Sequence, residues 1–246
     1  MIQAPSRRDR VRAATTGEIK QTARRILVER GPAAVSLRAI AREMGMTAPA
    51  LYRYFDSHED LLTHVVADIF TEAGDEIYAA IAAAGASGGD LAAKVVAACR
   101  GFRRWSLDHR AEFGLIFGSP LPGLDLEHDD VLAECGRRFG GTFLSLIIEL
   151  WNKQPFAVPA PEEIDPGLLE QVERYRDGLG IDLPAGLVVT YLRCWVRLYG
   201  TVSLEVFGHM KFAVEDASPM FEYFLADTAP LLGLQYPPSQ PAPSEP

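Results

Sequence analysis

The stretch GMTAPALYRYFDSHEDLL at residues 45 to 62 carries side chains well suited to bind a phosphodiester backbone. The hydroxyls of Thr47 and Tyr52 can hydrogen-bond phosphate oxygens. Arg53 can clamp a phosphate or offer its two parallel donors to a guanine edge. These residue types indicate nucleic acid recognition, which requires rigid elements to present them.

Two short helices joined by a tight turn are predicted to position these groups. Ser36 is placed to cap the first helix, and Gly45 ends it. Thr47 is predicted to cap the second, with Pro49 in its first turn, where a missing amide costs no hydrogen bond. The apolar positions of the two helices are Leu37, Ile40, Ala41, Met44, Leu51 and Phe55. The spacing predicts a helix-turn-helix, whose second helix lies in the major groove.

Eight residues are predicted to contact DNA. Ser36 and the helix N-termini suit phosphate, and Ala48 and Ala50 are small enough to approach thymine methyl groups. The full set is Ser36, Arg38, Thr47, Ala48, Ala50, Tyr52, Arg53 and His58. In the alternative interpretation, the Tyr-Arg-Tyr-Phe cluster only packs within a helical protein.

The charge of the chain is unevenly distributed. Residues 1 to 53 hold eleven Lys or Arg against four Asp or Glu, whereas the rest holds thirteen against twenty-nine, so a net of +7 stands beside a net of -16. Such asymmetry favours a basic end that faces a polyanion and a second part with another task.

Glycine and proline divide the chain into helical lengths without strand alternation, which predicts an all-α fold. The first helix is predicted to begin at Thr15, which has capping-box spacing to Glu18. Further helices are predicted at 58–84, 90–109, 111–118, 128–152, 165–177, 184–209 and 217–233. The expected organisation is a basic disordered arm (1–14), a three-helix DNA-binding domain (15–62), a helical-bundle ligand-binding and dimerisation domain (63–235) entered through the long helix, and a disordered tail (236–246).

The run ILVERGPAAVSLRAIAREMGMTAPALYRYFDSHEDLL resembles the amino-terminal domain of the TetR family of transcriptional regulators. The resemblance covers residues 18 to 62 and includes the turn glycine, the capped helix, the Ile-Ala pair and the Leu-Leu ending. One departure is His58, because the family commonly carries a lysine there that touches a phosphate. A mostly neutral histidine would weaken that contact and could make it pH dependent.

The second domain resembles the Trp-His-Gly type of ligand-binding domain of the same family more loosely. HRAEFGLIFGSPLPG at 109–123 and WVRLYGTVSLEVFGH at 195–209 carry this likeness, although Tyr199 replaces the signature histidine. The resemblance implies a domain that dimerises through its last two long helices and encloses an inducer. It also carries the expectation of repression.

The predicted helix 184–209 is apolar on nearly every side, which favours a partner subunit packed against it. The predicted interface residues are Val188, Leu192, Val196, Tyr199, Ser203, Phe221 and Phe224. Aromatic residues of the middle helices are predicted to line a pocket for an apolar or aromatic molecule. This set is Phe102, Trp105, Phe113, Phe117, Phe143, Trp151 and Trp195, although for each residue taken alone a core position is the stronger interpretation.

Features of an enzyme are weak in this sequence. The stretch GASGG at residues 85–89 matches Gly-x-Ser-x-Gly but follows a helical run, whereas the nucleophile elbow requires a preceding strand. His109 is interpreted as part of a polar helix end. Cys99, Cys135 and Cys194 are odd in number and embedded in apolar patterns, so buried thiols are expected rather than a disulfide or zinc site. We expect no catalytic site, cofactor or metal.

The sequence therefore predicts a DNA-binding transcriptional regulator, expected to be a repressor that binds a palindromic operator in duplex DNA as a homodimer. A small, largely apolar effector is expected to release it. The alternative is a helical small-molecule carrier that ignores DNA. No apolar run of about 18 residues and no signal peptide is found, so a cytoplasmic protein without membrane contact is expected.

Overall fold

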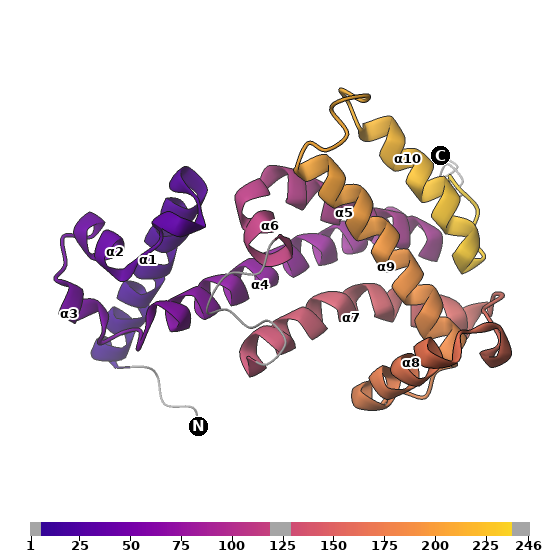
Figure 1. The fold of residues 1–246 in the computed structure, drawn as a ribbon, viewed down its shortest axis with the longest axis horizontal. Coiled ribbons are helices and arrows are strands. Elements are labelled where there is room, and N and C mark those ends of the chain that lie inside the picture. The colour runs from indigo at the N-terminus through magenta and orange to yellow at the C-terminus, as the bar shows by residue number, and fades with distance from the viewer. Residues whose placement is uncertain (1–5, 119–128, 238–246) are drawn as a thin grey trace, which may run out of the picture. The chain divides into compact units, whose positions relative to one another are not determined.

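The computed structural model describes residues 6–118 and 129–237 of the 246-residue chain. Within these ranges the secondary structure is α-helix and 3-10 helix without strands, so the predicted all-α fold is confirmed. The chain divides into two compact units, one made of Met1–Ala73 with His109–Phe139 and the other of Gly74–Asp108 with Gly140–Pro246. Helices α4 and α7 contribute residues to both units (Figure 1).

The first unit begins with three helices that form the predicted helix-turn-helix domain (Figure 1). Its elements are α1 (Arg7–Arg30), η1 (Pro32–Ala34), α2 (Leu37–Glu43), α3 (Ala48–Leu51), the first part of α4 (His58–Ala86), α6 (Arg110–Phe117) and the first part of α7 (Asp130–Lys153). The buried side chains of Ile19, Ile26, Ile40, Leu51 and Phe55 form the core beneath α2 and α3.

Helix α1 begins at Arg7, eight residues before the predicted start at Thr15. Ser6 caps it: the Asp9 amide donates to Ser6 Oγ at 3.2 Å, and the Ser6 amide donates back to Asp9 Oδ2 at 3.1 Å. The Thr15 hydroxyl instead donates to the Val11 carbonyl within the helix. Residues 7–14 are therefore helical rather than part of a disordered arm. Residues 1–5 lie outside the described part of the chain. So do residues 238–246, which make up most of the predicted tail (236–246).

The N-terminal caps of the next helices agree in part with those predicted from the sequence. Ser36 Oγ accepts from the Ala39 amide at 3.2 Å, as predicted, and at the start of α4 Ser57 Oγ accepts from the Asp60 amide at 3.0 Å. Thr47 is the N-cap residue of α3 by position, but its side chain makes no capping bond, which corrects the prediction. Gly45 takes a positive φ of 63°, a conformation that favours glycine at the turn between α2 and α3.

The second unit is organised around α9 (Ala185–Val206), which packs against α5, α8 and α10 (Figure 1). Its other elements are α5 (Leu91–Asp108), the remainder of α4 and α7, η2 (Pro161–Glu163), α8 (Pro166–Leu179), α10 (Ser218–Thr228) and η3 (Ala229–Leu232). These bounds agree with the predicted helices to within a few residues, except that α10 ends at Thr228 and continues as η3.

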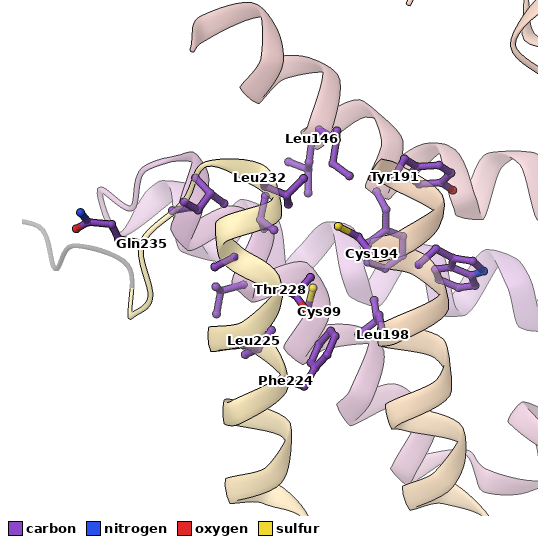
Figure 2. Close-up of a pocket in the computed structure, with 18 residues that line it drawn as sticks. Cys99, Leu146, Tyr191, Cys194, Leu198, Phe224, Leu225, Thr228, Leu232 and Gln235 are labelled. Carbon is purple, nitrogen blue, oxygen red and sulfur yellow. The ribbon is translucent and has the colours of Figure 1, made fainter. Parts of the chain in front are cut away.

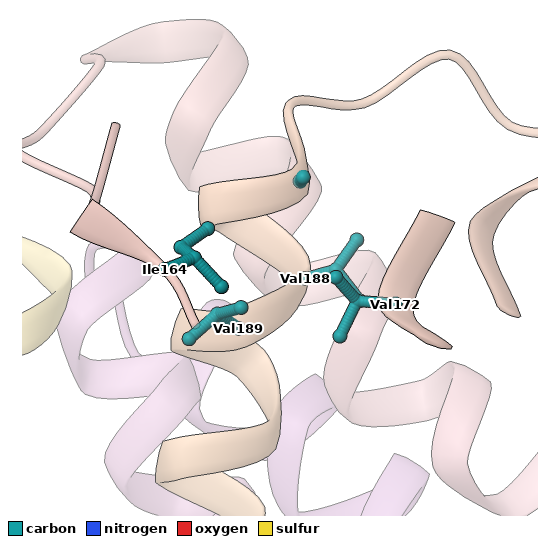
Figure 3. Close-up of a cluster of buried hydrophobic side chains, with 5 residues drawn as sticks. Ile164, Val172, Val188 and Val189 are labelled. Carbon is teal, nitrogen blue, oxygen red and sulfur yellow. The ribbon is translucent and has the colours of Figure 1, made fainter. Parts of the chain in front are cut away.

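One end of α9 is fixed by a cluster with α8 and the segment before it. Its buried members are Ile164, Val172, Ala185, Val188 and Val189 (Figure 3). At the other end of α9, Glu205 accepts from the Arg103 guanidinium, with Arg103 Nε at 2.7 Å from Glu205 Oε2. Arg103 also donates to Ser218 Oγ at 2.9 Å, so this pair joins α5, α9 and α10. None of the helices in the described ranges could span a membrane.

Candidate DNA-reading surface and ligand cavity

Helix α3 is short and is held in place by its buried residues. After Leu51 the chain continues in a tight turn, with the Arg53 amide donating to Ala50 O at 3.3 Å and the Tyr54 amide to Leu51 O at 2.9 Å. Leu51 and Phe55 are buried in the core of the first unit. Tyr52, 56% exposed, and Arg53 therefore project to the surface.

All eight predicted DNA contacts retain accessible surface. Ser36, Arg38, Thr47, Tyr52 and Arg53 are exposed, while Ala48, Ala50 and His58 are partly exposed. The Ser36 hydroxyl oxygen accepts a hydrogen bond from the Ala39 amide, so the hydroxyl proton can still be donated to a phosphate oxygen. The Thr47 hydroxyl is not used as a cap and can face a phosphate. In the described residues, His58 Nε2 is buried without a hydrogen-bond partner.

A row of arginines beside this surface comes from the first two turns of α1. Arg12 Nη2 donates to the Arg53 carbonyl at 3.0 Å, and its guanidinium lies 5.4 Å from the centre of the Tyr54 ring. These contacts hold the start of α1 against the end of α3. The exposed residues of this extension are Arg7, Arg8 and Arg10. This helical extension differs from the disordered arm predicted for residues 1–14, although Ser6 and Asp9 have the spacing of a capping box.

An ion-pair cluster joins three helices of the first unit. Arg24 of α1 donates through Nη2 to Glu72 of α4 at 2.8 Å and through Nε to Glu112 of α6 at 2.9 Å. His109 Nε2, at the start of α6, lies 3.4 Å from Glu72 Oε1. Hydrogen bonding to Glu72 raises the pKa of Arg24 above its ordinary value, and Glu112 is only 5% exposed. Removing Arg24 would leave a buried carboxylate unpaired, so the cluster fixes α6 to α1.

The second unit contains a cavity of about 60 Å³ between α5, α7, α9, α10 and the segment that follows α10 (Figure 2). Its walls are Ala92, Val95, Val96, Cys99, Phe143, Leu146, Ile147, Tyr191, Cys194, Trp195, Leu198, Phe224, Leu225, Thr228, Ala229, Leu232, Leu234 and Gln235. No charged residue is among them. This composition suits an uncharged, apolar ligand.

Both parts of the chain match known family models. Residues 19–65 match the model described as "Bacterial regulatory proteins, tetR family", and residues 95–228 match "Tetracyclin repressor-like, C-terminal domain". The chain belongs to the TetR family. It is therefore a DNA-binding transcriptional regulator. Neither model specifies the Trp-His-Gly subtype, which stays a prediction.

TetR-family relatives extend this likeness over most of the chain. The HTH-type transcriptional regulator Rv1816 of Mycobacterium tuberculosis is 30% identical over 203 residues, covering 82% of this chain and 84% of the relative. The crystal structure of the regulatory protein SCO4313 has a TM-score of 0.71 and 30% identity, covering 91% of this chain and 98% of that one. A TetR/AcrR regulator from Thermobifida fusca, at 20% identity and TM-score 0.56, covers 89% and 97% and shares the fold. The carrier that ignores DNA is set aside on this basis.

Two of the seven predicted pocket residues of this TetR regulator, Phe143 and Trp195, line the observed cavity. Phe102 is buried beside both of them, with its ring 5.7 Å from that of Trp195. Trp105 is also a buried residue of the second unit, and Trp151 packs on Phe156 at 5.2 Å between ring centres.

The other two predicted pocket residues belong to the first unit. Phe113 and Phe117 pack together with ring centres 5.1 Å apart, and Phe117 also contacts Phe70 and Phe139. These rings form part of the core around α4, α6 and α7 rather than lining the cavity. The sequence pattern could not separate the two sets, because a core aromatic and a cavity aromatic share the same helical spacing.

The three cysteines of the regulator are free thiols, as predicted, but each is partly buried rather than fully buried. Burial raises the pKa of Cys99 to about 12, with Cys194 adding to the effect, and burial raises that of Cys194 to about 11. Both line the cavity and remain protonated at neutral pH. They are therefore poor nucleophiles and poor metal ligands there.

The predicted interface residues fall into three groups. Val188 and Phe221 are each 1% exposed and are used for packing within their own subunit. Phe224 lines the cavity. The remaining residues, Leu192, Val196, Tyr199 and Ser203, retain accessible surface on α9.

Exposed apolar side chains on α9 and α10 are together called the exposed stripe. Its apolar members are Val196 (65% exposed), Leu204 and Phe207 from α9 and its end, with Met220 and Tyr223 on α10. At Gly200, an added Cβ would meet no atom of its own subunit. A groove of about 280 Å³ lies along the same helix between Leu168, Val189, Leu192, Arg193, Val196 and Arg197. Several large exposed apolar side chains on two helices that pack together are typical of a protein interface.

Proposed function

We propose that this regulator is a ligand-responsive repressor that binds a palindromic operator as a homodimer. The observation that carries the proposal is the exposed surface at the end of α3, where Tyr52 and Arg53 lie in the turn after the helix and Arg12 of α1 donates to the Arg53 carbonyl. The protein acts in the cytoplasm, where its partner is duplex DNA. Its effector is a small apolar molecule.

The DNA contacts divide by chemistry. Ser36, Thr47 and Tyr52 offer hydroxyls to phosphate oxygens, which set the register of the protein on the duplex. Arg53 reads a guanine edge or clamps a phosphate. The arginines at the start of α1 track the backbone, because Arg12 fixes that turn beside α3. Their contribution is electrostatic and independent of sequence.

The exposed stripe on α9 and α10 is the proposed dimer surface. Two copies that meet through the same stripe are related by a two-fold axis, so each residue of the stripe meets the partner's equivalent surface. Val196 and Leu204 supply apolar area, and Gly200 allows the two helices to approach closely. Such a dimer presents two α3 helices to an operator with inverted half-sites.

Ligand binding is coupled to the dimer through shared elements. Helices α9 and α10 carry cavity-lining residues on one face and the exposed stripe on another. A ligand that moves α10 against α9 therefore alters the surface presented to the partner. A coupling free energy of about 1–3 kcal/mol would change operator affinity about 5- to 150-fold.

Selection from a pool of random duplexes tests this function. The purified protein should enrich an inverted repeat whose half-sites are about 10 base pairs apart, or a multiple of that spacing. The Tyr52→Ala, Arg53→Ala double variant should enrich no motif. Recovery of unrelated sequences by the wild-type protein would refute the proposal of an operator-binding dimer.

A further inference from the structure

The cavity of the second unit can select its ligand by charge. None of its 18 lining residues carries a charge. A buried ion without a partner loses its hydration without compensation, at a cost of several kcal/mol. A carboxylate or an ammonium group is therefore excluded from this cavity, and an uncharged ligand is favoured.

The cavity also has few polar groups available to a ligand. The Tyr191 hydroxyl already donates to the Gly140 carbonyl at 3.3 Å. The Gln235 amide points away from the cavity in Figure 2. Cys99 and Cys194 offer only weak donors, because a protonated thiol forms poor hydrogen bonds. Two strong hydrogen-bonding side chains remain, the indole of Trp195, which can only donate, and the hydroxyl of Thr228, which can donate and accept.

Thr228 lies at the end of α10 and is 8% exposed. Its Oγ1 is buried without a hydrogen-bond partner in the described residues. A buried helical threonine commonly donates to the carbonyl four residues before it, as Thr190 does to Gly186 O at 2.9 Å. The great majority of buried polar side-chain atoms are hydrogen-bonded, so the unmet hydroxyl of Thr228 at the cavity wall indicates a missing partner.

We propose that the cavity binds an uncharged, largely apolar molecule with one hydroxyl or carbonyl group, which hydrogen-bonds Thr228 Oγ1. A threonine hydroxyl both donates and accepts, so alcohols, phenols and ketones all fit. An engineered cavity of about 150 Å³ holds benzene. The present 60 Å³ therefore accepts a ring only when its walls move. The proposal rests on the proposed function for the ligand's role as effector.

Calorimetric titration with three probes of similar shape tests this assignment. Phenol carries the hydroxyl, toluene lacks it, and benzoate is ionised at pH 7. The wild-type protein should bind phenol and toluene but not benzoate. Thr228→Val keeps the side-chain shape without the hydroxyl, so the Kd of phenol should rise about 2- to 10-fold while that of toluene stays within about 2-fold.

Two further variants control for indirect effects. Thr228→Ser retains the hydroxyl and should keep the affinity of the wild-type protein for phenol. Thr190→Val makes the same chemical change at a buried threonine outside the cavity and should leave both affinities unchanged. Circular dichroism confirms that each variant is folded.

Three results would overturn the assignment: an equal change for phenol and toluene in Thr228→Val, benzoate binding as tightly as phenol, or no binding of either uncharged probe. Operator binding is measured separately. Loss of probe discrimination with intact operator binding removes only the ligand assignment. Intact discrimination without operator binding would instead remove the regulatory role and leave the ligand assignment standing.

Discussion

At the scale of single residues, the proposed DNA contacts depend on the exposed side chains of Tyr52 and Arg53. Tyr52 and Arg53 are exposed because Leu51, the last residue of α3, and Phe55, which follows the next turn, fill the core. That division could be predicted, since it depends on spacing within one short stretch of the chain. The unmet hydroxyl of Thr228 could not, because it depends on which residues of α5 and α9 surround it.

The two cavity thiols predict how stability depends on pH. An unfolded thiol ionises near pH 8.5, whereas burial raises the pKa of Cys99 to about 12 and of Cys194 to about 11. Between about pH 8.5 and these values, the thiols are ionised in the unfolded state and protonated in the folded state. The free energy of unfolding therefore falls as pH rises through this range. Each thiol should lower the free energy of unfolding by up to about 1.4 kcal/mol per pH unit in this window.

Urea unfolding between pH 8.5 and 11 measures this effect. The Cys99→Ala, Cys194→Ala variant should show a shallower loss of stability with pH than the wild-type protein. Both proteins should have the same pH dependence between pH 6 and 8, where neither state ionises its thiols. Identical slopes above pH 8.5 would show that the thiols are not protected by burial.

At the scale of elements, most helix bounds follow from local signals. The apolar periodicity and the Ser36 and Ser57 caps define α2 and α4 without reference to the rest of the fold. The start of α1 was predicted too late, because its first turns carry charged residues and no apolar stripe. The cavity could not be located, because it is formed by helices more than a hundred residues apart in the chain.

The early start of α1 predicts a measurable electrostatic contribution to DNA binding. Arg7, Arg8 and Arg10 are exposed on a turn that Arg12 attaches to the end of α3. Replacing the three exposed arginines with Gln should weaken binding to all duplexes alike. If each contacts one phosphate, the slope of log K against log salt should become less negative by about 0.9 per contact.

Fluorescence anisotropy at several salt concentrations checks this prediction. Arg137→Gln and Arg174→Gln change exposed arginines on α7 and α8 and serve as controls. They should leave the slope unchanged. A triple variant with the slope of the wild-type protein would place the arginines of α1 away from the duplex.

At the scale of the whole molecule, the account depends on a dimer. Val196 is 65% exposed in the subunit, so a charge there is tolerated by the monomer. In a two-fold interface, Val196→Asp adds a carboxylate from each subunit within the contact. Like charges opposed in an interface cost several kcal/mol, so the dimer dissociation constant should rise at least about 10-fold.

Sedimentation velocity over a range of protein concentrations measures that constant. Val131→Asp, at a 52% exposed valine on α7, is the matched control and should leave it unchanged. If Val196→Asp dissociates no more readily than the control, the α9 stripe is not the dimer surface.

The most direct test of the central claim is an anisotropy titration of the wild-type protein on its selected duplex, compared with the Tyr52→Ala, Arg53→Ala variant over a series of salt concentrations. The account predicts tight, sequence-selective binding by the wild-type protein that weakens steeply with salt, and loss of that selectivity in the variant. Equal affinity of both proteins for all duplexes would contradict the assignment of α3 as the DNA-reading helix.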